Sequence, residues 1–165
     1  MNLKDRDRIV RLLFWLYIIL TIKLIVFKYP FDQLWEIASG WEKGVILEGL
    51  ETANFTIGKS IRMYIHHFRA LNWFPNLFGN LLIFVPFGYL LPICYPRLSK
   101  WQCTMAVSVT FILGIELFQL LSAFGAFDVD DILLNALGVV LGYGVYRYRM
   151  KGKREEEKRR KIIDK

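Results

Sequence analysis

The sequence predicts an all-α integral membrane bundle of four transmembrane helices with both termini in the cytoplasm. Hydrophobic residues make up 55% of the 165 residues, and the mean hydropathy is +0.32. A soluble domain of this size has too little interior to bury so much apolar surface. The apolar residues also cluster in runs, without the periodicity of one helix face or one strand face. We therefore expect lipid as the solvent, and we expect the net charge of +7 to flank the spans and not to bind nucleic acid.

Four apolar segments approach the length that a helix needs to cross a hydrocarbon core about 30 Å thick. The predicted spans are 12–28, 76–95, 102–124 and 131–148. A basic leader, residues 1–11, precedes the first span. No small-x-small cleavage site follows the span, so we expect a retained anchor and not a cleaved signal peptide. A charged tail, residues 149–165, follows the last span.

The distribution of Lys and Arg predicts the orientation of these spans, because basic residues concentrate in cytoplasmic connections. The leader carries four of them, the connection after the second span carries Arg97 and Lys100, and the chain from Arg147 onward carries ten. The connection between the third and fourth spans, residues 125–130, carries none. Cytoplasmic termini and two outer connections satisfy all of these counts.

Residues 29–75 form the first outer connection and are predicted to contain an interfacial amphipathic segment. Apolar side chains recur near helical spacing within residues 31–50, and Trp35 and Trp41 are typical of the aromatic belt at a membrane surface. A second amphipathic helix is expected from about residue 58 to 68, before the second span.

Strongly polar residues inside the spans are the most informative feature of the chain, because lipid makes them costly and they mark candidate functional sites. All of them fall in the predicted outer half of the bilayer. Glu116 lies about 12 Å below the outer end of the third span, counted at 1.5 Å per residue, with Gln119 on the same face. The predicted ligand-binding residues are Asn76, Asn80, Glu116, Gln119, Asp128, Asp131 and Asn135.

Two interpretations of these polar residues stay open. They can hold the helices together as a closed network, because carboxamides donate and accept hydrogen bonds and can satisfy Glu116. Alternatively they line a cavity open to the outside, since Asp128 or Asp130 suffices to cap the fourth span and further acids remain. No metal site is predicted, because the acids lack the spacing of a calcium loop, and no cofactor is expected.

Two further features predict architecture. Pro86 and Gly88 interrupt the second span and predict a kink. Gly138 and Gly142 form a small-residue face on the fourth span that suits close packing against a neighbouring helix.

In order and spacing, these motifs resemble the VanZ-like family. They are Asn76-x-x-x-Asn80, Phe84-x-Pro86-x-Gly88, Glu116-x-x-Gln119 and Phe127-Asp128-Val129-Asp130-Asp131-x-x-x-Asn135-x-x-Gly138, preceded by Asn54-Phe55-Thr56 and Lys59-x-Ile61. The resemblance covers a VanZ-like domain at residues 50–147. Many members carry an Arg before the acidic cluster, where this chain has Gly125-Ala126-Phe127, so an anionic ligand at Asp128 and Asp131 is not expected here.

The resemblance implies a small multi-pass protein of the bacterial plasma membrane and cell envelope, with tolerance of the glycopeptide antibiotic teicoplanin in some members. The expected partners are membrane lipids and a lipid-linked cell-wall precursor or a glycopeptide, with no nucleic acid. The sequence does not predict an oligomeric state.

Two functions are consistent with these features. In the first, the protein is not an enzyme and binds a lipid-linked or lipophilic molecule in an outward-facing polar cavity. In the second, it is a small membrane enzyme acting on a lipid or envelope substrate, with Glu116 as general acid or base and Asp131 or Asn135 orienting the substrate. Binding is favoured, because no Ser–His or Cys–His arrangement accompanies the outer acids. Transport is not favoured, because polar residues do not continue to the inner side.

Overall fold

The computed structural model describes residues 3–27, 29–41, 45–66 and 73–163. The regular secondary structure of this part of the chain is helical apart from one isolated parallel β-bridge, so the predicted all-α class is confirmed. The elements are α1 Leu3–Ile25, α2 Phe31–Ser39, α3 Val45–Thr52, α4 Lys59–His66, α5 Trp73–Ile83, α6 Val85–Cys94, the 3-10 turn η1 Pro96–Leu98, α7 Trp101–Ser122 and α8 Val129–Ile163.

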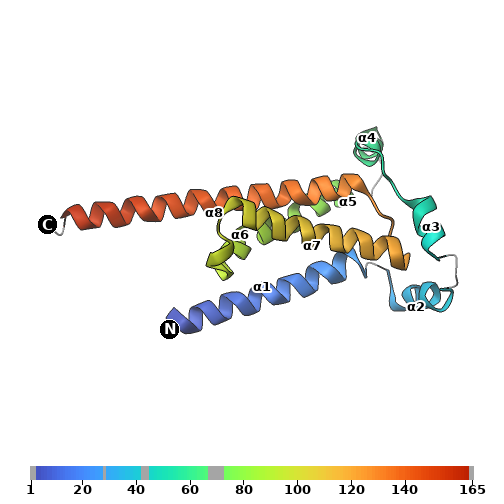
Figure 1. The fold of residues 1–165 in the computed structure, drawn as a ribbon, viewed down its shortest axis with the longest axis horizontal. Coiled ribbons are helices and arrows are strands. Elements are labelled where there is room, and N and C mark those ends of the chain that lie inside the picture. Colours follow the sequence, from blue (N-terminus) through green and yellow to red (C-terminus); the bar gives the residue numbers. More distant parts are fainter. Residues whose placement is uncertain (1–2, 28, 42–44, 67–72, 164–165) are drawn as a thin grey trace.

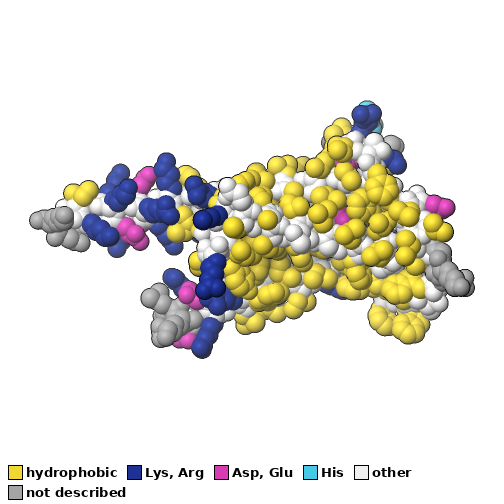
Figure 2. All heavy atoms as spheres, viewed as in Figure 1, with side chains coloured by type: hydrophobic (Ala, Val, Ile, Leu, Met, Phe, Trp, Pro, Cys, Tyr) yellow, Lys and Arg dark blue, Asp and Glu magenta, His cyan; other side chains and the backbone are white. Residues whose placement is uncertain are grey.

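The long helices run along one axis and define two ends of the molecule (Figure 1). The N-terminal end of α1 and the C-terminal end of α8 lie at the same end, which we call the terminal end. The short helices α2, α3 and α4 gather at the opposite end, which we call the loop end. Hydrophobic side chains cover the bundle between the two, whereas Lys and Arg concentrate on the terminal end (Figure 2).

Three stretches of the described chain are long and apolar enough to cross a membrane. They are Leu77–Cys94, which spans most of α5 and all of α6, Trp101–Ser122, which is α7, and a window within Val129–Ile163, which is α8. They correspond to the predicted spans at 76–95, 102–124 and 131–148. Helix α1 is not among them, because charged residues fill its first third, and the fourth span therefore stays a prediction.

Helix α8 is longer than the predicted span. It continues without a break from Val129 to Ile163, or about 52 Å at 1.5 Å per residue, against a hydrocarbon core of about 30 Å. The span at 131–148 and the described part of the tail are thus one helix. Glu, Lys and Arg, which dominate the tail, are good helix formers, and their side chains remain exposed to solvent.

The core lies where α6, α7 and α8 meet, with α1 packed on its side. Phe84, Ile112 and Val139 are fully buried, each with 0% of its surface exposed. Phe14 and Ile18 of α1 join the same cluster of buried side chains. Helix α1 is thus part of the folded bundle.

The predicted small-residue face packs as expected. A Cβ atom on Gly138 would overlap the carbonyl oxygen of Leu81, and one on Gly142 would overlap that of Val85. From the opposite side, a Cβ on Gly88 would overlap the carbonyl oxygen of Val139. Glycine therefore lets the backbone of α8 approach α5 and α6 more closely than any other residue allows.

The predicted interruption of the second span is also present. Helix α5 ends at Ile83 and α6 begins at Val85, with Phe84 between them. Pro86 occupies the first turn of α6, where its missing N–H removes no intrahelical hydrogen bond. The chain thus changes helix at the depth where Phe84 enters the core.

At the loop end, α2 lies within the segment 31–50 where a short amphipathic helix is expected, α3 follows it, and the helix expected at 58–68 is α4 up to His66. Residues 67 and 68 lie outside the described chain. Trp41 donates from Nε1 to the carbonyl oxygen of Ser122 at 3.0 Å and packs on Phe124, so it contacts the end of α7. Trp35 is 66% exposed, and its predicted place at the membrane surface stays a prediction.

Candidate functional site: a polar network beneath the loop end

The turn between α7 and α8 is joined to the segment between α3 and α4. The main-chain N–H of Asn54 donates to the carbonyl oxygen of Phe127 at 2.8 Å, and that of Val129 donates to the carbonyl oxygen of Asn54 at 3.0 Å. These two bonds form the isolated bridge between Asn54 and Asp128. They place the acidic cluster beside residues that precede it by about 70 positions in the sequence.

Asp128 accepts three hydrogen bonds through its carboxylate. Oδ1 accepts from Nδ2 of Asn54 at 2.8 Å and from the main-chain N–H of Asp130 at 2.8 Å, and Oδ2 accepts from the hydroxyl of Ser60 at 2.5 Å. The bond to the N–H of Asp130 caps the N-terminus of α8, which confirms the predicted cap. Because the other two donors are Asn54, between α3 and α4, and Ser60, in the first turn of α4, Asp128 joins the two connections at the loop end.

Asp130 caps a different helix. Its side chain is fully buried, and its carboxylate accepts the N–H groups of Gly58 at 2.6 Å, Ser60 at 2.8 Å and Ile61 at 3.2 Å. These are N–H groups that the first turn of α4 leaves without an intrahelical partner. Gly58 has no side chain to cap α4 and has φ of 81°, which favours glycine. Asp130 therefore supplies the cap from a distant part of the chain.

Glu116 supports this assembly from within α7. Only 1% of its surface is exposed, and Oε2 accepts the main-chain N–H of Asp128 at 3.0 Å. Glu116 thus holds the main chain of the residue whose own carboxylate binds Asn54 and Ser60. We call Asn54, Ser60, Glu116, Asp128 and Asp130 the polar network.

The side-chain amide of Gln119 contacts α1. Its Nε2 donates to the carbonyl oxygen of Ile25 at 3.1 Å, which lies at the last residue of α1. Its amide also lies where a Cβ atom on residue 125 would be, so Gly125 makes room for it. Gln119 is buried like Glu116, which is predicted to share its face of α7, and its amide holds the C-terminal end of α1 against α7.

The remaining predicted residues are Asp131, Asn135, Asn80 and Asn76. Asp131 is half-buried in the first turn of α8, and Asn135, one turn further, is buried with 1% of its surface exposed. In the described part of the chain, Oδ1 of Asn135 has no hydrogen-bond partner. Asn80 is half-buried on α5, and the side chain of Asn76 lies outside what the structure describes. A ligand-binding role for these residues stays a prediction.

The negative charge of the acidic cluster affects a neighbouring tyrosine. Tyr64 of α4 is half-buried, and burial together with the charges of Asp131, Asp128 and Asp130 raises the pKa of its hydroxyl above the ordinary value. The phenol therefore stays protonated and can donate a hydrogen bond over the physiological pH range. No group of three His, Cys, Asp or Glu side chains in the described ranges could hold a metal ion.

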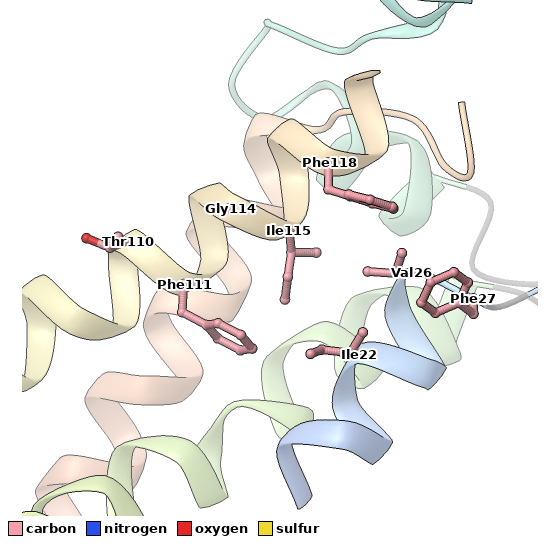
Figure 3. Close-up of a pocket in the computed structure, with 8 residues that line it drawn as sticks. All are labelled: Ile22, Val26, Phe27, Thr110, Phe111, Gly114, Ile115 and Phe118. Carbon is pink, nitrogen blue, oxygen red and sulfur yellow. The ribbon is translucent and has the colours of Figure 1, made fainter. Parts of the chain in front are cut away.

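An apolar groove lies between α1 and α7 (Figure 3). Its volume is about 360 Å³, and Ile22 of α1, with Val26 and Phe27 just after that helix, faces Phe111, Ile115 and Phe118 of α7 across it. Gly114 contributes no side chain to this wall. The hydrogen bond from Gln119 to Ile25 is made by the immediate neighbours of Phe118 and Val26, so the groove reaches the depth of the polar residues.

Sequence reasoning missed Asn54, Ser60, Asp130 and Tyr64 as members of this site. Asn54 appeared only as part of the family resemblance, and Ser60 lies between its two quoted neighbours. Asp130 was considered only as a cap for the helix that contains it. Helical periodicity carries no signal for a cap supplied to a distant helix, whereas the run of three acids was a usable sign that one of them serves another element.

Comparison with known proteins agrees with the resemblance. The family model of VanZ/LLP1 matches residues 14–150, from the second turn of the apolar part of α1 to the exposed part of α8. Protein VanZ of Enterococcus faecium is 30% identical over 114 residues, which cover 62% of this chain and 68% of that protein. No solved structure is significantly similar. With its helical fold, three apolar helices of membrane-spanning length and this match, the chain belongs to the VanZ/LLP1 family of membrane proteins.

Proposed function

We propose that this protein is a multi-pass protein of the bacterial plasma membrane that binds a lipophilic or lipid-linked molecule from the outer leaflet, without catalysing a reaction. The observation that carries the proposal is the apolar groove between α1 and α7, which reaches the depth of the buried Gln119 amide. A molecule with an acyl or prenyl chain and a polar head has both parts matched there, since the chain contacts aromatic and aliphatic side chains and the head lies at the loop end.

The orientation follows from the charges. The terminal end carries the basic leader and the basic tail, so it faces the cytoplasm and the loop end faces outward. Helix α1 completes a fourth span, because Leu12, Leu16 and Ile19 are 59%, 53% and 62% exposed and need lipid around them. The groove then opens within the bilayer between two membrane-crossing helices.

The polar network supports binding more than catalysis. Asp128 and Asp130 each accept three hydrogen bonds from their own chain, which fixes the outer connections over the bundle. Glu116 is buried and accepts the main-chain N–H of Asp128, so it holds the α7–α8 turn. We assign these acids to the framework of the site. Such binding would extend to teicoplanin, a glycopeptide with an acyl tail, and would then contribute to tolerance of it.

The groove can be tested by filling it. Gly114 lines the groove, and no atom lies within 4 Å of the position its Cβ would take, so Gly114→Leu adds a side chain without a backbone clash. Gly144 of α8 has equally open space and does not line the groove, which makes Gly144→Leu the matched control. The probe is a phospholipid whose acyl chain carries a diazirine, crosslinked in membranes and located by mass spectrometry.

We expect wild type and Gly144→Leu to be labelled at α1 and α7 within the groove, and Gly114→Leu to lose most of that labelling while it remains abundant in the membrane. The same variants are then compared for teicoplanin susceptibility when expressed in a sensitive host. Equal labelling of all three proteins, or labelling confined to other helices, contradicts the proposal.

A further inference from the structure

A second cavity lies at the terminal end, on the other side of the bundle from the loop-end network. It has a volume of about 570 Å³ and lies between the end of α6, the connection that follows it, and α8. We call it the basic cleft, and the residues that define it here are Tyr89, Pro92, Ile93, Pro96, Arg149 and Lys153. Its floor on α6 is apolar and its wall on α8 is cationic, a combination that neither a soluble anion nor an acyl chain alone would match.

Arg149 is positioned before any ligand arrives. Its Nη1 donates to the hydroxyl of Tyr89 at 2.9 Å, and its guanidinium carbon lies 6.0 Å from the centre of the Tyr89 ring. One hydrogen bond occupies one of the five N–H donors of a guanidinium, so a fork of donors remains for an anion. In the described part of the chain, no carboxylate oxygen lies within 4.0 Å of Arg149 or Lys153.

The surrounding charges keep the cleft positive. Lys153 lies one helical turn beyond Arg149, on the same face of α8. Glu156 also lines the cleft and opposes these two cations with one negative charge. A neighbouring cavity of about 340 Å³ is lined by Arg147, Lys151 and Arg154, and by Ser99, which it shares with the basic cleft. The C-terminal part of α8 thus presents cations to both of these cavities.

The depth of Arg149 matches a membrane surface. Twenty residues separate it from Val129 at the loop end of α8, which is about 30 Å at 1.5 Å per residue and equals the thickness of a hydrocarbon core. Pro92 and Ile93 lie on the bilayer side of that level, since both belong to the apolar span Leu77–Cys94. The cleft therefore has cations at the level of lipid head groups and apolar contacts just below them.

We infer that the basic cleft binds the phosphate group of an anionic phospholipid of the cytoplasmic leaflet. Arg149 contacts two phosphate oxygens with its remaining donors, Lys153 contributes a second positive charge, and Ile93 contacts the first methylene groups of the acyl chains. Tyr89 positions Arg149. This inference does not depend on the outer groove, because the two sites share no residue and lie at opposite ends of the molecule.

The test uses the full chain purified in a mild detergent and measures retained lipid by native mass spectrometry, with phosphatidylglycerol and phosphatidylcholine offered at equal concentration. Each basic residue near a membrane surface contributes about fivefold to the binding of anionic lipid. We expect wild type to prefer phosphatidylglycerol, Lys153→Gln to weaken that preference about fivefold, and Arg149→Gln/Lys153→Gln to weaken it about 25-fold. Both side chains are exposed, so these substitutions leave folding intact.

The matched control is Lys158→Gln/Arg159→Gln, which removes the same charge from the exposed tail beyond the cleft. It should keep the preference of wild type, and an equal loss in this variant would mean that lipid binding follows the general charge of the tail, which overturns the inference. A double variant in the cleft that retains the wild-type preference overturns it as well. Glycerol phosphate is added as a soluble competitor, and complete displacement of the lipid by it would show that the cleft recognises a free phosphate compound.

Discussion

The two ends of the molecule handle charge in opposite ways. At the loop end, Asp130 is fully buried and three main-chain N–H groups surround its carboxylate. At the terminal end, Arg149 and Lys153 are exposed on a helix that extends beyond the bundle. Buried charges are costly unless hydrogen bonds satisfy them, whereas exposed charges contribute little to folding. The comparison shows that the acids stabilise the connections at the loop end, while the cations at the terminal end remain available to partners.

The comparison requires that the two ends of the molecule lie on opposite sides of a membrane. Cysteine labelling tests this directly, and its expected effect is the largest, because each position is either labelled or not. Single cysteines are placed at Ala126, in the α7–α8 turn, and at Lys100, just before α7, both of which are exposed. The background carries Cys94→Ala and Cys103→Ala, because these are the free cysteines. We expect a membrane-impermeant maleimide to label Ala126→Cys on intact cells and Lys100→Cys only after permeabilisation. The opposite pattern would reverse the orientation proposed here.

The next largest effect is expected from the buried acid of the loop end. Asp130→Ala leaves the N–H groups of Gly58, Ser60 and Ile61 without their acceptor and should lower the free energy of unfolding by about 3 kcal/mol or more. The control at the terminal end is Glu157→Ala, an exposed residue of the α8 tail, which should change stability by less than about 0.5 kcal/mol. Thermal unfolding in detergent measures both. Similar losses for the two variants would remove the distinction between the ends.

Glu116 separates a framework role from a catalytic one. Glu116→Ala removes the acceptor for the N–H of Asp128 and should cost about 2 kcal/mol, whereas Glu116→Gln keeps an acceptor oxygen and should cost less than about 1 kcal/mol. The measurements are unfolding temperature, abundance in the membrane and teicoplanin susceptibility. If Glu116→Gln is as abundant as wild type but loses all phenotype, the carboxyl group has a chemical role and our assignment of Glu116 to the framework is wrong.

The smallest expected effect lies at the boundary of the loop end. Ala123 closes α7 with φ of 54°, in the left-handed region that costs residues with a side chain roughly 1–2 kcal/mol. Ala123→Gly relieves this strain, but glycine loses more backbone entropy on folding than alanine does. The net effect should be a stabilisation of about 0.5–1 kcal/mol. The control is Ala136→Gly inside α8, which should destabilise by a similar amount. A loss of stability at position 123 would mean that the outer connections tolerate no loosening of the α7–α8 turn.

Much of the fold followed from the one-dimensional pattern of the chain. Long apolar runs predicted the three candidate spans, because a membrane span must satisfy its own backbone hydrogen bonds over a fixed thickness, but they did not predict that α8 continues to Ile163. Gly138 and Gly142 predicted a close helix contact, and Pro86 predicted the break between α5 and α6. The site was predictable only as a set of polar residues at one depth. The hydrogen-bond partners of these residues were not predictable from the sequence.

The sequence alone determined which parts of the chain are apolar enough for lipid, where helices break and approach closely, and which end gathers positive charge. These properties depend on near neighbours along the chain, so local composition encodes them. Only the tertiary structure decided that Asp130 caps α4, that Gln119 reaches α1 and that Glu116 supports the turn beside Asn54. Such hydrogen bonds join residues far apart in sequence, and their partners are set by how the helices and connections pack in three dimensions.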